Sequence, residues 1–77
     1  MRIITQNGDR DLPYEQYIVS TPIDTDIVFA DNVHHEGKFS RVTLGYYNSH
    51  DDARDAAAEM RGAYLRGDSI FRMPPAI

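Results

Sequence analysis

The longest amphipathic stretch of the chain lies between residues 48 and 67. Its apolar side chains recur at the spacing of one helical face, at Ala53, Ala56, Ala57, Met60, Ala63 and Tyr64. Ser49 precedes this pattern as an N-cap residue. Gly67 follows it as a residue that adopts a left-handed conformation and ends a helix. We therefore predict one helix from Asp51 to Arg66.

Shorter segments on both sides of this helix are rich in β-branched residues or alternate between apolar and polar positions, as strands do. They cover residues 2–6, 17–21, 26–30, 39–47 and 70–73, with a short return arm at 11–12. Asn7-Gly8 predicts a tight hairpin turn between the first strand and the return arm. Pro13 donates no backbone hydrogen bond, so the arm must end there or lie at a sheet edge.

The segment 39–47 shows the clearest alternation. The first set of side chains, expected to face the helix, comprises Val42, Leu44 and Tyr46. The second set, expected on the opposite face of the sheet, comprises Phe39, Arg41, Thr43 and Tyr47.

The order of these elements predicts an α+β fold, ββββαβ, with a small, mainly antiparallel sheet of four to five strands and one helix packed on one face. Residues 1–77 form a single domain. The predicted core consists of Ile4, Ile18, Ile27 or Val28, Val42, Leu44, Ala53, Ala56, Met60, Tyr64, Phe71 and Met73. Because only one helix is predicted, the other face of the sheet has no covering layer and is available to a partner.

Composition narrows the possible functions. The chain of 77 residues is 42% apolar and 26% charged, as in ordinary globular domains. The absence of cysteine excludes disulfides, thiolate metal sites and cysteine nucleophiles. A net charge of −4 disfavours direct nucleic-acid binding. No segment has the length of a membrane span or the pattern of a signal peptide, so we expect a cytoplasmic protein that does not bind membranes.

Both ends of the chain carry further patterns. The chain opens with M-R-I-I-T-Q-N-G followed by D-L-P-Y-E. Its second half contains Leu44-Gly45-x-Tyr47, Ser49, Ala53, a mid-helix Met60, Tyr64 and Phe71-x-Met73-Pro74. With these patterns the chain resembles a group of short proteins of Gram-positive bacteria, their prophages and their integrative elements. The resemblance covers both ends and the helix but not residues 22–38. It implies a small cytoplasmic accessory protein of a mobile element and carries over no catalytic or binding residue.

Metal-ligand residue types gather in two places, His34-His35-Glu36 and His50-Asp51-Asp52. Adjacent strand residues point to opposite faces, and no H-x-x-x-H or cysteine partner is present, so we expect neither a metal nor a cofactor. The serines lack a G-x-S-x-G context and the glycines form no phosphate-binding loop, so we expect no enzyme activity. The alternative is a small-ligand or metal-binding protein, or a hydrolase, that uses His34, His35 and His50.

The aromatic residues favour a binding function. The chain has five tyrosines and no tryptophan, and tyrosine is enriched at protein interfaces. Phe39, Arg41 and Tyr47, expected together on the uncovered sheet face, form the candidate binding patch. We therefore expect a non-enzymatic binding module that acts by protein–protein interaction. The resemblance implies that it belongs to a mobile element and acts as an inhibitor of a host or defence protein.

Acidic residues suggest a second surface. Asp24, Asp26 and Asp31, with Glu36, cluster in the part of the chain outside the resemblance. If they lie on one face, they form a row of carboxylates that mimics nucleic-acid phosphates and competes for a basic protein cleft. A third hypothesis is that the uncovered face forms a homodimer with no other partner.

Overall fold

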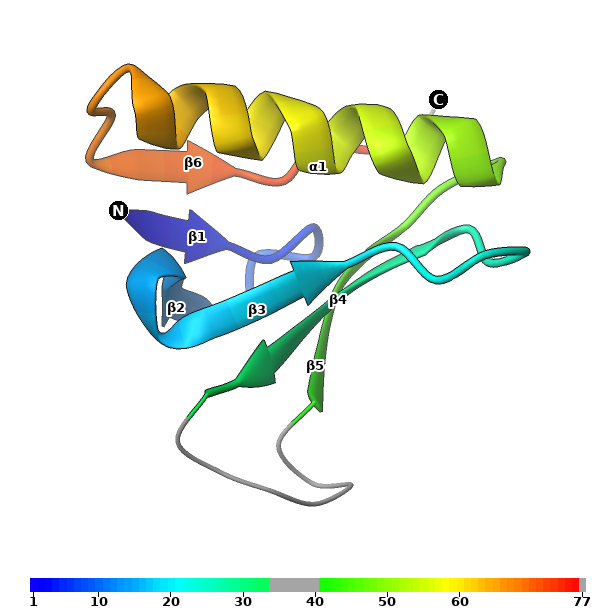
Figure 1. Ribbon diagram of the computed structural model, residues 1–77, viewed down its shortest axis with the longest axis horizontal. Coiled ribbons are helices and arrows are strands. Elements are labelled where there is room, and N and C mark those ends of the chain that lie inside the picture. The colour runs from blue at the N-terminus through cyan, green and yellow to red at the C-terminus, as the bar shows by residue number, and fades with distance from the viewer. Residues whose placement is uncertain (34–40, 77) are drawn as a thin grey trace.

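The computed structural model describes residues 1–33 and 41–76, in which six strands and one α-helix are found (Figure 1). The strands are β1 (Arg2–Ile4), β2 (Asp11–Pro13), β3 (Tyr17–Ser20), β4 (Ile27–Asn32), β5 (Arg41–Tyr46) and β6 (Ile70–Arg72), and the helix is α1 (His50–Leu65). A single 3-10 turn, Tyr14–Gln16, joins β2 to β3. The predicted α+β class is confirmed, but the strands form two sheets of three instead of one sheet of four to five.

The two sheets differ in direction. In the sheet β2-β1-β6, β1 pairs antiparallel with β2 and parallel with β6. In the sheet β3-β4-β5, both pairings are antiparallel. Figure 1 shows α1 running above β6 and β1, with β3, β4 and β5 below them. The first and last strands of the described chain are therefore neighbours.

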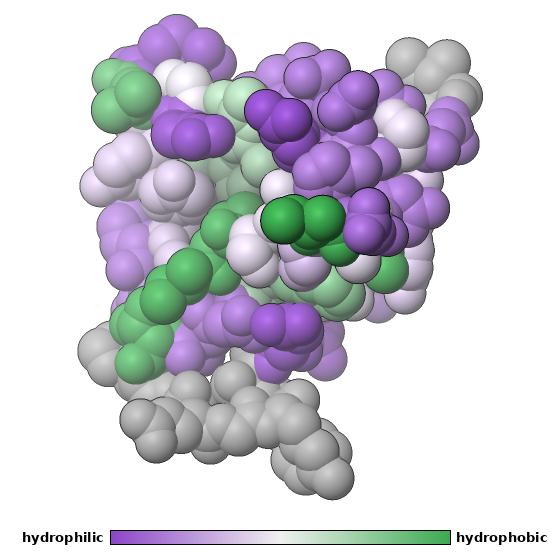
Figure 2. Space-filling view, turned by 45° about the vertical axis from the view of Figure 1, so that its right-hand side comes forward, coloured by the Kyte–Doolittle hydropathy of each residue, from purple (hydrophilic) through white to green (hydrophobic). Residues whose placement is uncertain are grey.

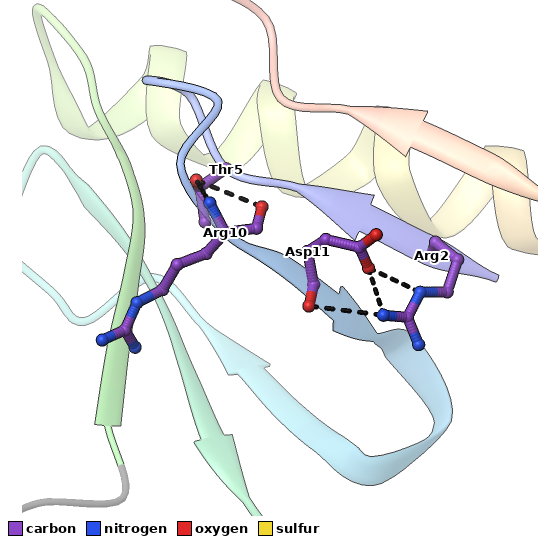
Figure 3. Close-up of polar contacts among 4 residues, drawn as sticks. All are labelled: Arg2, Thr5, Arg10 and Asp11. Atoms are coloured by element: carbon purple, nitrogen blue, oxygen red, sulfur yellow. Dashed lines mark hydrogen bonds and ion pairs between the residues drawn. The ribbon is translucent and has the colours of Figure 1, made fainter.

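The Asn7-Gly8 turn forms as predicted. Gly8 has a φ of 79°, and its N–H donates to the carbonyl of Thr5 at 2.8 Å. The Thr5 hydroxyl, which is buried, accepts from the backbone N–H of Arg10 at 3.2 Å (Figure 3). Across the same hairpin Arg2 forms an exposed ion pair with Asp11. Beyond Asp11, β2 ends at Pro13 on the sheet edge, as its missing N–H requires.

Both ends of α1 follow from the sequence. The Ser49 side chain accepts a hydrogen bond from the N–H of Asp52 and caps the first turn. At the other end Gly67 has a φ of 81°, and its N–H donates to the carbonyl of Tyr64 while Asp68 donates to Ala63. These two bonds are the Schellman arrangement that a C-terminal glycine permits. Among the described residues, no helix is long and apolar enough to cross a membrane.

One core is shared by both sheets and the helix. Its buried members are Ile3, Leu12, Val28, Ala30, Leu44, Tyr47, Ala53, Ala56, Met60 and Met73. Two predicted members, Val42 and Phe71, are half-buried and pack against this cluster. Three other predicted core positions were wrong. In β1, Ile3 is fully buried and Ile4 only half-buried, because the pleat points the neighbouring residue inward. Ile18 and Tyr64 are exposed. Ile18 lies on the outer side of β3. The Tyr64 ring packs on the Tyr14 ring, with 4.7 Å between the ring centres.

A β-bulge in β5 changes which side chains face inward. Val28 pairs with Gly45, whereas the next residue of β4, Phe29, pairs with Thr43. Leu44 is therefore an extra residue, and alternation resumes one position later. As a result Tyr46 points outward and Tyr47 points into the core, the reverse of the sequence-based prediction.

Gln6 connects the two sheets. Its backbone N–H donates to the carbonyl of Leu44 at 2.8 Å. Its side-chain amide accepts from the N–H of Tyr46 at 2.9 Å and donates to the carbonyl of Tyr46 at 2.8 Å. The same amide nitrogen contacts the carbonyl of Pro74 at 3.2 Å. The side chain thus pairs with β5 as a strand backbone does.

We predict that Gly45→Ala destabilises the fold by about 1–3 kcal/mol, because a Cβ there overpacks the core. The added carbon lies 3.0 Å from the Tyr47 ring and 3.3 Å from Cβ of Gln6. Gly62→Ala is the matched control: within α1 its Cβ meets only the end of the Arg66 side chain, at 3.4 Å. That variant should gain about 0.5–1 kcal/mol of stability. Urea unfolding measures both values, and equal effects of the two substitutions would contradict the prediction.

Candidate binding surface

The sheet β3-β4-β5 presents one side to the core and the other to solvent. Side chains that point away from the core follow from the pairing register and from burial. They are Ile18 and Ser20 from β3, Ile27, Phe29 and Asp31 from β4, and Arg41, Thr43 and Tyr46 from β5. We call this set the outward face. It corresponds to the uncovered sheet face that the sequence predicted, but different residues form it.

The outward face keeps large apolar side chains in contact with solvent. Ile18 is 61% exposed and Tyr46 is 60% exposed, so no described element covers these positions. Ile27 and Phe29 are half-buried between them. In Figure 2, which shows one side of the molecule, a band of hydrophobic side chains reaches the surface beside mostly hydrophilic neighbours. Exposed apolar groups on a rigid sheet are the ordinary basis of a protein-binding surface.

Arg41 is held in one orientation on this face. Its Nε and Nη2 donate to the two carboxylate oxygens of Asp31 at 2.9 and 3.1 Å. Its guanidinium carbon lies 4.7 Å from the centre of the Phe29 ring. The hydrogen bond to Asp31 raises the pKa of Arg41 further above its usual range. Arg41 is therefore a fixed cation stacked on an aromatic ring, and it loses little freedom when a partner binds it.

A hollow borders the outward face along β5. Gln6 and Asn7 of the first hairpin form one wall, and Thr43, Gly45 and Tyr46 form the other. Because Gln6 is bonded to the backbone of Tyr46, the two walls are fixed relative to each other. The hollow can accommodate one side chain of a partner docked on the sheet.

Tyr47, predicted as an exposed binding residue, is a core residue. It is only 7% exposed, and its hydroxyl donates to the carbonyl of Pro74 at 2.8 Å. Its N–H donates to the carbonyl of Asp26. Tyr47 therefore fastens the segment after β6 to the sheet. Phe39 lies outside the described residues, so of the predicted patch only Arg41 is placed on the outward face.

The predicted acidic residues are not brought together. Asp24 and Asp26 lie at the turn before β4, where Asp24 adopts a left-handed φ of 64°. Asp31 lies near the other end of β4, about 16 Å from Asp26 by the rise of a strand, and its charge is paired with Arg41. Glu36 lies outside the described residues. The described carboxylates do not form a continuous row.

The predicted histidine cluster is only partly described. His34 and His35 lie outside the described residues. His50 begins α1, and its Nδ1 lies 2.9 Å from the carbonyl of Thr25. Within residues 1–33 and 41–76, no three His, Cys, Asp or Glu side chains are close enough to hold one metal ion.

Sequence reasoning missed Ile18, Phe29 and Tyr46 as surface residues. Ile18 was placed in the predicted core, and uninterrupted alternation placed Tyr46 on the side of the strand that faces the helix. One signal was present for Tyr46: an isolated glycine within a strand, here Gly45, is typical of a bulge. No sequence signal distinguishes Ile18 from a buried isoleucine.

The structural role of Tyr47 predicts a pH dependence. Burial, and secondarily the charge of Glu59, raises the pKa of Tyr47 to about 12. Unfolded tyrosine ionises near pH 10. Between these two pH values the unfolded state binds fewer protons than the native state, so the free energy of unfolding falls as pH rises. Below pH 10 the contribution of Tyr47 is complete.

Tyr47→Phe should therefore lower stability at neutral pH by about 0.5–1.5 kcal/mol, the net value of its hydrogen bond. It should also remove the Tyr47 part of the decline above pH 10. Urea unfolding from pH 7 to 12 measures both effects. Tyr46→Phe, which removes an exposed hydroxyl, should change neither. An unchanged alkaline decline in Tyr47→Phe would show that the Tyr47 hydroxyl does not cause it.

The comparisons with known proteins returned no match. No family model matches the chain, and no match is found among curated proteins or solved structures.

Proposed function

We propose that this protein is a non-enzymatic binding module that docks its outward face on another protein. The observation that carries the proposal is the exposure of Ile18 and Tyr46 on a sheet face that no described element covers. Phe29 lies between them on β4, and Arg41 is fixed on its ring. Aromatic residues and arginine are the types that contribute most to protein-binding hot spots. A rigid sheet presents them at low entropic cost.

A protein partner fits this face better than a nucleic acid does. Of its two charged residues, Arg41 is paired with Asp31, so the described outward face carries no net charge. The chain as a whole carries a net charge of −4. Phosphate backbones are bound by unpaired cations, which neither feature supplies. We retain the expectation that the protein does not bind nucleic acid directly.

The biological context rests on the sequence resemblance described above. It favours a cytoplasmic accessory protein of a prophage or integrative element that inhibits a host or defence protein. The outward face supplies a surface for such an action. The mimicry of nucleic acid by acidic residues has less support, because Asp24 and Asp26 are separated from Asp31 and Asp31 is paired.

Two other functions remain as alternatives. A metal-binding or hydrolytic site would use His34, His35 and His50; a stoichiometric zinc complex lost in His50→Ala, with the fold retained, would favour it. A homodimer would use the outward face itself. Sedimentation of the pure protein tests this second case, since a dimer disrupted by Tyr46→Ala would assign the face to a second copy.

We expect Tyr46→Ala and Ile18→Ala to weaken partner binding by about 2 kcal/mol, or about thirtyfold in Kd, because each removes an exposed anchor. Leu65→Ala is the matched control: Leu65 is an exposed apolar side chain on α1, away from this face. Capture from host lysate followed by mass spectrometry identifies the partner, and titration of the purified partner measures the affinities.

The fold should survive in all three variants, as circular dichroism can verify. Two results would contradict the proposal. One is that the wild type captures nothing beyond an unrelated acidic protein of the same size. The other is that Tyr46→Ala and Ile18→Ala bind the captured partner as tightly as Leu65→Ala does.

A further inference from the structure

β3 is an edge strand with unused backbone groups. The N–H of Val33 donates to the carbonyl of Gln16. Hydrogen-bonded pairs alternate along an antiparallel ladder, so Ile18 and Ser20 direct their backbone groups toward β4. Val19 directs its N–H and C=O away from β4. No backbone group of the described residues pairs with them.

This edge lacks one protection that edge strands commonly carry, a charged side chain. Residues 17–22, Y-I-V-S-T-P, contain no charged side chain, although charges are a common device against unwanted strand pairing. The opposite edge of the same sheet is different, because Gln6 bonds the backbone of Leu44 and Tyr46 on β5. Of the two edges, β3 is the one open to another strand.

A groove lies between this edge and α1. Val19, Ser20 and Thr21 line it on the strand side, and Ala57, Met60 and Arg61 line it on the helix side. Tyr14, which stacks on Tyr64 of α1, stands at one end. Proteins bind extended peptides by adding them as a strand to an exposed sheet edge, and pockets beside the edge give specificity.

The charge of the groove favours a ligand with a carboxylate. Among the described residues that line it, Arg61 is the only charged one, and no ion pair joins it to the described carboxylates. The small side chain of Ala57 leaves room on the helix side. The groove therefore combines a backbone donor and acceptor at Val19, an apolar wall and one cation.

We infer that this groove binds an extended peptide segment of a partner protein, added as a strand to β3. The peptide bonds the N–H and C=O of Val19, places an apolar side chain against Ala57 and Met60, and pairs a carboxylate with Arg61. The groove and the outward face, to which Ile18 points, lie on different sides of β3 and share only Ser20 at their border. It does not depend on the function proposed for that face.

The probe is a phage-displayed library of short random peptides selected on the intact protein. We expect selected sequences to share an apolar residue and a carboxylate. Synthesising the best peptide with a free or an amidated C-terminus distinguishes a terminal carboxylate from an acidic side chain. Amide hydrogen exchange in the complex should newly protect Val19, whereas Ile18 and Ser20 are protected already in the free protein.

Two variants separate the strand edge from the cation. Val19→Pro removes the unused N–H and leaves the bonds to β4 intact, so it should fold and abolish peptide binding, while Val19→Ala should still bind. Arg61→Gln should weaken binding about tenfold, as expected for the loss of a charged hydrogen bond. Arg54→Gln is its matched control, because Arg54 is an exposed arginine of α1 outside the groove.

Three outcomes would overturn the inference. The first is that selection yields no peptide above the level found on Val19→Pro, or on Arg61→Gln if the proline variant does not fold. The second is that a bound peptide leaves the exchange of Val19 unchanged. The third is that the protein self-associates through β3 without selecting peptides, which would assign the edge to a second copy.

Discussion

The side-chain amide of Gln6 holds the two sheets of this protein in register. An amide carries the same donor and acceptor as a peptide group, so it can bond the N–H and C=O of Tyr46 as a neighbouring strand would. Neither three-stranded sheet has a core of its own. Ile3 and Leu12 from one sheet meet Val28 and Leu44 from the other in a single cluster. The bridging residue therefore aligns two halves that are stable only together.

The same bridge links the fold to the surfaces proposed for binding. By occupying the edge of β5 it leaves β3 as the accessible edge, and it fixes Tyr46 at the margin of the outward face. The two surfaces use alternate residues of one strand: Ile18 faces the solvent side of the sheet, and Val19 faces the core side and exposes its backbone at the edge. A partner could therefore engage either surface without displacing the core.

The sequence predicted the helix most accurately, because its signals are local. The bounds differ by one residue at each end, and both caps, Ser49 and Gly67, act as expected. The α+β class and an uncovered sheet face were also predictable. The division into two sheets was not, because Gln6 reaches across forty residues to Tyr46. The membership of the face failed at one place, where the bulge at Leu44 reversed the alternation and exchanged Tyr46 with Tyr47.

The parallel pairing of β1 with β6 has a consequence for synthesis. The pairings of β3, β4 and β5 join residues close in sequence, so these strands can begin to pair before the other sheet is complete, and they gain their core only when it forms. β1 must wait until Ile70–Arg72 have left the ribosome, because those residues complete its sheet. During that interval Ile3 lacks its core, and one edge of β1 is open to other chains. The order of translation thus leaves the first strand exposed longest to aggregation.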